Sequence, residues 1–204
     1  ASGGQYALTF DNHNSVNGIR EFASSKGACV QYVPVGFPEL RLEQQSLDKV
    51  LDSADKSAKN LFAFPAQSNF SGVKHPLSWI EYAQKKGWDV LLDAAAFVPA
   101  NRLDLNEINP DFVCISFYKM FGYPTGIGML LILNSSFEKL ERPWFAGGTV
   151  NFASVQGNNH YLAGNEAAFE DGTINYLNIP AVKIGLLHLE KVGMESIAIR
   201  VNEL

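Results

Sequence analysis

The chain has 204 residues, of which 47% are hydrophobic and 18% charged, a composition that is ordinary for a globular protein with a real core and that argues against disorder. Its formal net charge is −5 and no basic run offsets it, so the electrostatics disfavour nucleic-acid binding and favour a small-molecule substrate. No apolar run approaches the ~18 to 20 residues of a membrane span, and the N-terminus lacks the basic and apolar regions of a signal peptide, so we expect no membrane association.

Apolar patterning, caps and glycine or proline stops predict strands and helices that alternate along the chain. Strands are expected at residues 6–10, 28–35, 60–64, 88–93, 112–117 and 126–133. Helices are expected at residues 16–23, from residue 46 through 51, at 77–86, at 179–192 and from 195 to 204. This alternation predicts an α/β fold with an open, largely parallel sheet and helices on both faces. The turn between the last two strands is too short for a parallel crossover, so we expect that pair to be antiparallel and the sheet to be mixed.

The two cysteines, Cys29 and Cys114, both lie in apolar, strand-like runs. Such positions predict buried, reduced thiols. Because reduced thiols are typical of the cytosol, we expect a cytoplasmic protein. We nominate neither cysteine as a nucleophile and no residue as a metal ligand.

Lys119 follows the apolar strand at residues 112–117 and precedes a glycine-rich turn at residues 122–128. An apolar run with β-branched members is typical of a strand that is buried on both faces. A lysine that leaves such a strand into a cavity is partly desolvated, and burial lowers the pKa of an amine and makes it a better nucleophile towards an aldehyde. The alternative is a lysine that extends from the strand end into water.

Asp93 ends the preceding apolar strand. In a parallel sheet the carboxyl ends of the strands line one edge, so we expect Asp93 and Lys119 to face the same crevice. The pair favours pyridoxal phosphate, whose aldehyde takes a lysine and whose ring nitrogen needs a carboxylate to stay protonated. Alternatively, Asp93 caps the next helix, an ordinary role for an aspartate at a strand end.

Several ordered motifs of this chain resemble class V aminotransferases of pyridoxal-phosphate fold type I, and within that superfamily the aminotransferase-like domain of the molybdenum cofactor sulfurases, which are relatives of the cysteine desulfurases. The similarity runs over nearly the whole chain. It implies the three-layer large domain of fold type I, with a mostly parallel sheet and one antiparallel strand. The motifs are Leu92-Asp-Ala-Ala-Ala96, Ser116-Phe-Tyr-Lys119, Gly122, Gly126-Ile-Gly128, Phe64-Pro-Ala-Gln-Ser-Asn-Phe-Ser-Gly72 and Phe145-Ala-Gly-Gly-Thr-Val150.

The resemblance also implies roles for polar residues around the cofactor. His13 matches a histidine that stacks on the pyridine ring, although alone it reads as a helix cap. Asn69 matches an asparagine that approaches the ring oxygen and the substrate, although alone it reads as a turn residue. Ser116 and Tyr118 match positions that bind the phosphate, whereas the ordinary role of Tyr118 would be core packing.

Thr149 follows two glycines whose backbone amides could form a phosphate-binding nest, although such pairs are also common in plain turns. The resemblance implies that this threonine reaches the phosphate held by the opposite subunit. We therefore expect a homodimer whose interface forms part of the active site.

Two positions depart from the pattern of many cysteine desulfurases. Ala96 stands where those enzymes carry a glutamine, and Tyr118 stands where they carry a histidine just before the lysine. Both differences favour the cofactor sulfurase branch over the housekeeping desulfurases.

Two stretches of the family have no match in this sequence. These are the phosphate loop upstream of the histidine region and the loop downstream of the lysine that carries the sulfur-accepting cysteine. We therefore expect residues 1–204 to be the central part of the large domain, without the N-terminal phosphate loop and the small domain. Alone, this stretch is expected to bind pyridoxal phosphate poorly and to be inactive, because most charge-assisted bonds to the phosphate would be missing.

The function implied by the resemblance is that of a pyridoxal-phosphate-dependent sulfurtransferase that takes sulfur from L-cysteine, with the molybdenum cofactor as a candidate acceptor. One alternative is a class V aminotransferase or a cysteine or selenocysteine lyase without a sulfur acceptor. A second is a non-catalytic α/β binding domain in which the lysine and the aspartate are structural. A nicotinamide enzyme is disfavoured because the sequence has no Gly-x-Gly-x-x-Gly dinucleotide loop.

Overall fold

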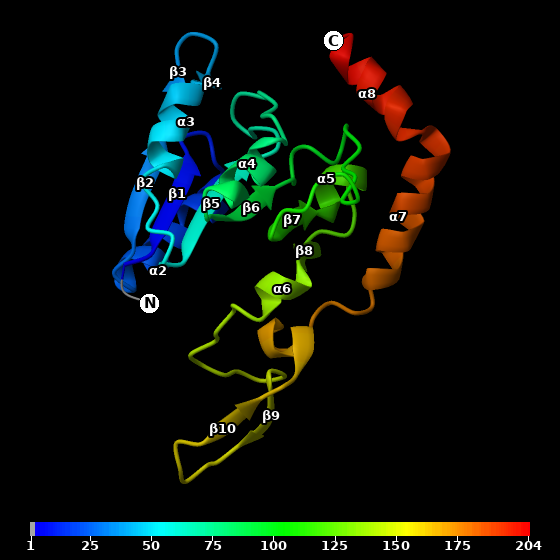
Figure 1. Cartoon of the computed structure of the whole chain (residues 1–204). Coiled ribbons are helices and arrows are strands. Elements are labelled where there is room, and N and C mark those ends of the chain that lie inside the picture. The colour runs from blue at the N-terminus through cyan, green and yellow to red at the C-terminus, as the bar shows by residue number, and fades with distance from the viewer. Residues whose placement is uncertain (1–2) are drawn as a thin grey trace.

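A six-stranded sheet forms the centre of the computed structural model, which describes residues 3–204 (Figure 1). Its strand order is β2-β1-β5-β6-β7-β8. Neighbouring strands run parallel from β2 through β7, and β8 alone is antiparallel, paired with β7. The mixed sheet predicted from the short turn is therefore confirmed. The strands are β1 (Gln5–Thr9), β2 (Cys29–Val33), β5 (Asn60–Pro65), β6 (Asp89–Asp93), β7 (Phe112–Ser116) and β8 (Gly128–Ile132).

Helices cover both faces of this sheet, as predicted. The larger apolar cluster lies on one face, where α3 (Gln44–Leu51) and α4 (Trp79–Lys85) contribute buried side chains such as Leu47 and Ile80. A smaller cluster lies on the other face beneath α1 (Asn14–Asn17) and α2 (Ile19–Ser25). Successive strand residues alternate between the two clusters: Phe62 and Phe64 belong to the larger one and Ala63 to the smaller.

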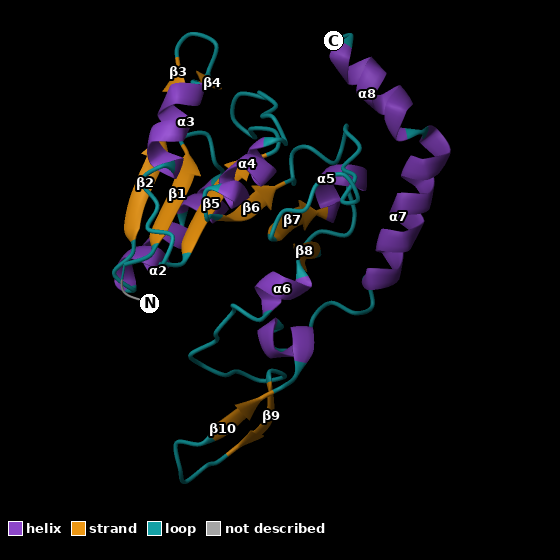
Figure 2. Ribbon diagram, viewed as in Figure 1, coloured by secondary structure: helices purple, strands orange, loops and turns teal. Residues whose placement is uncertain are grey.

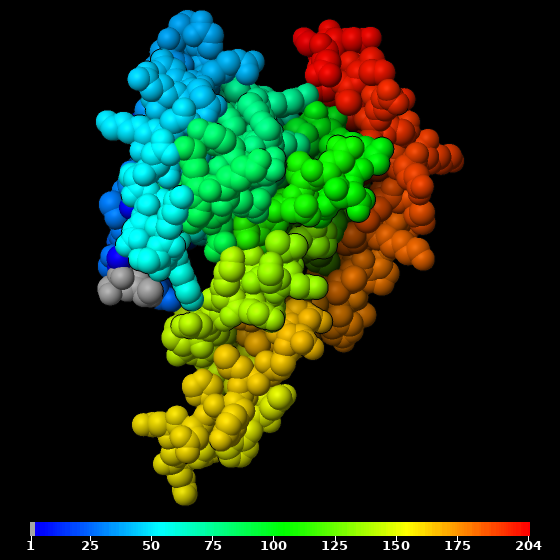
Figure 3. Space-filling model, viewed as in Figure 1, coloured from blue at the N-terminus to red at the C-terminus, as the bar shows by residue number. Residues whose placement is uncertain are grey.

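The chain after β8 extends beyond the sheet. Figure 2 shows the hairpin of β9 (Val150–Ala153) and β10 (His160–Leu162) projecting away from the sheet, and α7 (Ile179–Val192) lying on the side of the molecule next to α5 (Phe117–Phe121). Figure 3 shows the same hairpin as a protrusion of the molecular surface. The remaining elements are β3 (Val35–Gly36), β4 (Arg41–Leu42), α5 (Phe117–Phe121), α6 (Asn134–Phe137), β9 (Val150–Ala153), β10 (His160–Leu162), the 3-10 helix η1 (Asn165–Phe169), α7 (Ile179–Val192) and α8 (Met194–Asn202).

Three local expectations differ from the structure. The helix expected at residues 16–23 is two helices that meet at Gly18, and the first begins at Asn14. The strand expected through residue 117 ends at Ser116, so Phe117 opens α5. Neither cysteine is fully buried as expected: Cys114 is half-buried, and Cys29 is exposed because it is the first residue of β2, a strand at the edge of the sheet.

Within the described part of the chain, no helix combines the length and the apolar composition that crossing a membrane requires.

Candidate active site

The carboxyl ends of four neighbouring parallel strands carry most of the polar residues singled out from the sequence. His13 follows β1, and Asn69 lies in the turn after β5. Asp93 is the last residue of β6, and Lys119 lies in α5 directly after β7. Because these strands are parallel neighbours, their carboxyl ends meet at one edge of the sheet.

Lys119 and Asn69 are in direct contact at this edge. The Lys119 Nζ donates a hydrogen bond to the Asn69 Oδ1 at 3.1 Å. The lysine is half-buried and the asparagine is exposed. Two features fix the short helix that carries the lysine: the buried side chain of Phe117 anchors its start, and Gly122, with φ of 77°, ends it in the left-handed conformation that favours glycine.

Asp93 is buried, with 9% of its surface exposed. Its Oδ1 accepts a hydrogen bond from the Ala95 N–H at 3.0 Å, and its backbone oxygen accepts one from the Ala66 N–H at 2.8 Å. Cys114 lies opposite Asp93 in the register of β6 and β7. Burial, and after it the charge of Asp93, raise the pKa of Cys114 to about 11. This thiol is therefore protonated at neutral pH and is a poor nucleophile. The sequence likewise does not nominate it.

His13 caps α1 and is exposed. Its Nδ1 accepts a hydrogen bond from the Ser15 N–H at 3.2 Å. This capping bond uses only the Nδ1 atom at the edge of the ring, so both faces of the imidazole remain free for stacking. With Phe10, Asn12, Asn69 and their neighbours, His13 lines a hollow of about 420 Å³ between the β1–α1 loop and the turn after β5.

Ser116, Tyr118 and Thr149 lie in different surroundings. Ser116 occupies the N-cap position of α5 without a side-chain capping bond, and Tyr118 is 45% exposed rather than packed in the core. Thr149 is buried in a turn before β9, where its Oγ1 donates to the Ala146 oxygen at 2.8 Å and accepts from the Ala146 N–H at 2.9 Å. Ser116 and Tyr118 thus lie in or next to the short helix that carries Lys119. Thr149 instead directly precedes β9, whose hairpin with β10 projects from the molecule (Figure 1).

Sequence reasoning missed Asp11 and His75 at this edge. Their side chains are both buried, and the His75 Nε2 lies 2.8 Å from the Asp11 Oδ2. The sequence gives only a weak signal for this pair. It shows an aspartate just after a strand and a histidine before a proline, and the two residues are 64 positions apart.

A larger cavity, of about 810 Å³, lies between α5, β8 and α7. Its lining is mainly apolar, with Phe117, Met120, Met129, Leu131 and Leu186 among its members. None of the residues predicted to contact a cofactor lines it, so we assign the site to the sheet edge and not to this cavity.

Comparison with known proteins identifies the family. The sequence pattern of the family described as aminotransferase class V matches residues 2–204. The chain belongs to the class-V aminotransferase family. The predicted resemblance is thereby confirmed.

Curated relatives share the same name across several animals. The chain is 41% identical to the human molybdenum cofactor sulfurase over 211 residues, which is 97% of this chain and 23% of the human protein. It is 42% identical to the Bos taurus molybdenum cofactor sulfurase over 210 residues, which is 96% of this chain and 23% of that protein. The chain thus spans about a quarter of the length of these relatives. The assignment of residues 1–204 to the central part of a large domain stays a prediction.

Solved structures of cysteine desulfurases share the fold. The apo cysteine desulfurase of Thermococcus onnurineus NA1 superposes with a TM-score of 0.79 at 26% identity, over 96% of this chain and 48% of that chain. The Escherichia coli cysteine desulfurase CsdA gives a TM-score of 0.79 at 21% identity, over 95% of this chain and 47% of that one. A C-DES variant with glycine covalently linked to its PLP cofactor gives a TM-score of 0.76 at 18% identity, over 96% of this chain and 51% of that chain. These similarities confirm the predicted fold class.

Proposed function

We propose that the full-length protein is a pyridoxal-phosphate-dependent sulfurtransferase that releases sulfur from L-cysteine and passes it on as a persulfide, with the molybdenum cofactor as the acceptor. The observation that carries this proposal is the contact between the Lys119 amine and the Asn69 amide at the sheet edge where Asp93 also ends its strand. The names of the relatives support the substrate and the acceptor.

The residues at this edge fit pyridoxal phosphate chemically. Lys119 supplies the amine that an aldehyde requires. Asp93 supplies a buried carboxylate whose Oδ1 is engaged by Ala95, while its Oδ2 receives no hydrogen bond from residues 3–204 and so remains available to a protonated ring nitrogen. His13 and Asn69 would contact the ring, and Ser116 and Tyr118 would donate hydroxyl groups to the phosphate. When bound, the cofactor supplies an electron sink for negative charge that develops on the substrate.

Each of these side chains has a definite task. The Asn69 Oδ1 accepts a hydrogen bond from the Lys119 Nζ and so would hold the amine at the edge of the sheet, where an aldehyde would react with it. With the cofactor bound, the Lys119 Nζ would also be the group that accepts and returns a proton at this edge. The negative charge of Asp93 favours a proton on a facing ring nitrogen through simple opposite-charge attraction.

Neither cysteine of this chain is placed to accept sulfur. The Cys114 thiol is protonated at neutral pH, as its raised pKa shows. Cys29 begins β2, so it lies at the amino end of the strands, opposite the edge that carries Lys119. The acceptor thiol must therefore come from another part of the full-length protein. We also propose a cytoplasmic homodimer in which Thr149 of one subunit serves the site of the other.

The test is product analysis with purified full-length protein. Wild type is expected to be yellow, to be fixed to its cofactor by borohydride at Lys119, and to convert L-cysteine to alanine with persulfide formation. Lys119→Ala is expected to lose this activity by several orders of magnitude, whereas Lys85→Ala, an exposed lysine of α4, should leave it unchanged. Pyruvate and ammonia in place of alanine would identify a lyase, amino transfer to a 2-oxo acid would identify a transaminase, and full activity in Lys119→Ala would reject the proposal.

A further inference from the structure

Asp11 and His75 form a buried hydrogen-bonded pair at the carboxyl edge of the sheet. The two side chains are 3% and 2% exposed, and the His75 Nε2 lies 2.8 Å from the Asp11 Oδ2. No other close contact between an acidic and a basic side chain among residues 3–204 has both side chains this deeply buried. A buried pair costs desolvation energy and is weak evidence for stability, so its value is better sought in the geometry that it imposes.

Both members of the pair are held by further contacts. The Asp11 Oδ1 accepts a hydrogen bond from the Thr9 Oγ1 at 2.8 Å. The His75 ring stacks on Trp79 of α4, with ring centroids 5.3 Å apart, and its backbone N–H donates to the Ala66 oxygen at 3.0 Å. Burial raises the pKa of Asp11, but the hydrogen bonds from His75 and Thr9 outweigh it and hold the pKa below its usual range. Asp11 is thus an anion, and because a carboxylate only accepts hydrogen bonds, its Oδ2 accepts one from the His75 Nε2–H.

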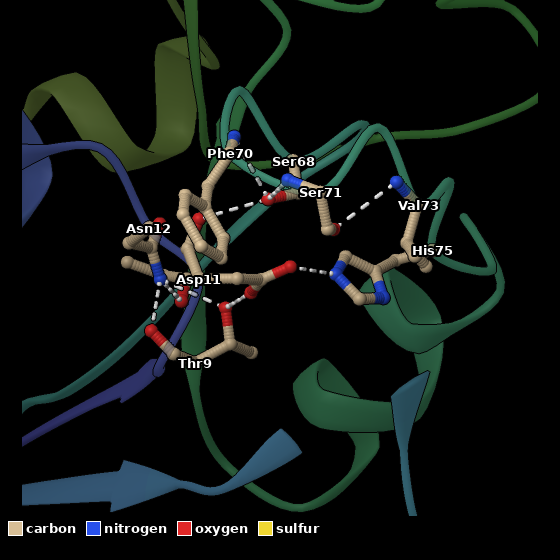
Figure 4. Close-up of polar contacts among 9 residues, drawn as sticks. Thr9, Asp11, Asn12, Ser68, Phe70, Ser71, Val73 and His75 are labelled. Atoms are coloured by element: carbon tan, nitrogen blue, oxygen red, sulfur yellow. Dashed lines mark hydrogen bonds and ion pairs between the residues drawn. The ribbon is translucent and has the colours of Figure 1, made fainter. Parts of the chain in front are cut away.

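The pair connects two loops that the proposed function uses. The Ser68 Oγ donates to the Asp11 backbone oxygen at 3.3 Å, and the same Oγ accepts from the backbone N–H groups of Phe70 and Ser71 (Figure 4). This bond therefore joins the loop after β1 to the turn after β5. Asp11 stands two residues before His13, and Ser68 stands one residue before Asn69.

We propose that His75 and Asp11 are positioning residues that set the β1–α1 loop against the turn after β5, and so fix Asn69 against Lys119 and His13 against the cofactor ring. The proposal rests on the proposed function for its role in catalysis. Its geometric part stands separately, because the contact from Asn69 to Lys119 joins two residues of this chain. Neither residue is assigned a contact with the substrate.

The first arm of the test uses cofactor-free, full-length protein. Competitive acetylation followed by peptide mass spectrometry reports how reactive the Lys119 amine is. His75→Phe keeps a ring that can stack on Trp79 and removes the donor to Asp11. We expect it to raise Lys119 labelling by roughly threefold to tenfold, the effect of losing about one hydrogen bond, and to match Asn69→Ala. His75→Gln, which restores an N–H donor, should label like wild type.

The matched control is Asp111→Asn, which alters another buried carboxylate at the amino end of β7, away from this edge. It should lower stability and leave Lys119 labelling unchanged. Equal labelling in wild type, His75→Phe and Asn69→Ala would overturn the proposal, as would an increase in Asp111→Asn of the same size. If His75→Phe does not fold, Asp11→Asn, which keeps the shape and removes the charge, is measured in its place with the same expectation.

The second arm adds pyridoxal phosphate. His75→Phe is expected to weaken cofactor affinity and lower kcat by about tenfold each, because misplacement of a reacting group is costly, with KM for L-cysteine changed less. Rescue by His75→Gln supports a positioning role, and unchanged affinity and kcat in His75→Phe overturn it. If wild type takes up no cofactor, the proposed function fails, and the labelling arm still decides whether the pair positions Asn69.

Discussion

Lys119 and Asn69 are 50 residues apart in the sequence, yet the lysine Nζ lies 3.1 Å from the asparagine Oδ1. This contact joins α5 after β7 to the turn after β5, across the carboxyl end of the intervening strand β6. Asp93 ends that intervening strand. The amine and the carboxylate required by the proposed chemistry are therefore brought to adjacent strand ends by the order of strands in the sheet.

Asn69→Ala should reduce activity and leave stability nearly unchanged. The bond to Lys119 is exposed, so its loss costs the fold at most about 1 kcal/mol. Activity should fall by roughly tenfold or more, because the amine is no longer oriented. The rate of alanine formation from L-cysteine tests the expected loss of activity, and a thermal melt of the same preparation tests the expected stability. Unaltered kcat in the variant would remove Asn69 from the site.

The two cysteines should react very differently with iodoacetamide. Cys29 is exposed, whereas burial and the Asp93 charge raise the pKa of Cys114 to about 11. At pH 8 roughly one Cys114 in a thousand is then a thiolate, and the thiolate is the reactive form. Peptide mapping should show Cys29 alkylated at least about tenfold faster. Cys29→Ser should remove the fast phase. Alkylation of both thiols at one rate would contradict the raised pKa of the half-buried Cys114.

Gly185→Ala should loosen the packing of α7 against the lysine helix. A Cβ at Gly185 would clash with the ring of Phe121, so the aromatic ring or the helix must move. Overpacking of this kind costs about 1 to 3 kcal/mol, and urea denaturation measures the cost. Lys183→Ala, an exposed position of the same helix, serves as the control. The double variant with Phe121→Ala should be less destabilised than the sum of the two single changes; simple additivity would argue against the clash.

Asp111→Asn should destabilise the protein in a pH-dependent manner. Burial raises the pKa of Asp111, but hydrogen bonds from Ser136, Gln84 and the Val90 N–H, with the charge of Lys139, outweigh it and hold the pKa below the ordinary value of 3.8. A carboxyl whose pKa is lowered on folding contributes stability that is present above its unfolded pKa and is lost as the pH falls through the folded pKa.

The expected loss in Asp111→Asn is about 1 to 3 kcal/mol at pH 7, because several buried donors lose a charged acceptor. Urea denaturation of the 204-residue chain at pH 7 and at pH 3 tests this expectation. The gap between wild type and variant should narrow at pH 3, below the ordinary pKa of 3.8, because the carboxyl group of the unfolded wild-type chain then binds a proton and stabilises the unfolded state. A gap that stays constant between the two pH values would mean that the charge of Asp111 contributes nothing.

Local patterns in the sequence determined the strands of the central sheet, most helices and the placement of Asp93 and Lys119 at one edge, but not the short strands β3, β4, β9 and β10. Continuous apolar runs are a local property, and they located β5, β6 and β7 within a residue or two of their bounds. The short turn after α5 determined the antiparallel pairing of β8, because a parallel crossover needs a longer connection. Asp93 and Lys119 were expected at the same edge of the sheet because the carboxyl ends of parallel strands all lie at one edge.

Only the tertiary structure decided which side chains meet. Cys29 looks buried from its apolar neighbours, but its exposure depends on β2 being an edge strand, which is a property of strand order. Asp11 and His75 are 64 residues apart, and no periodicity links an aspartate after one strand to a histidine beyond another. They meet because β1 and β5 are neighbours in the sheet. Burial and pairing are set by long-range packing, and a single sequence records only the short-range pattern.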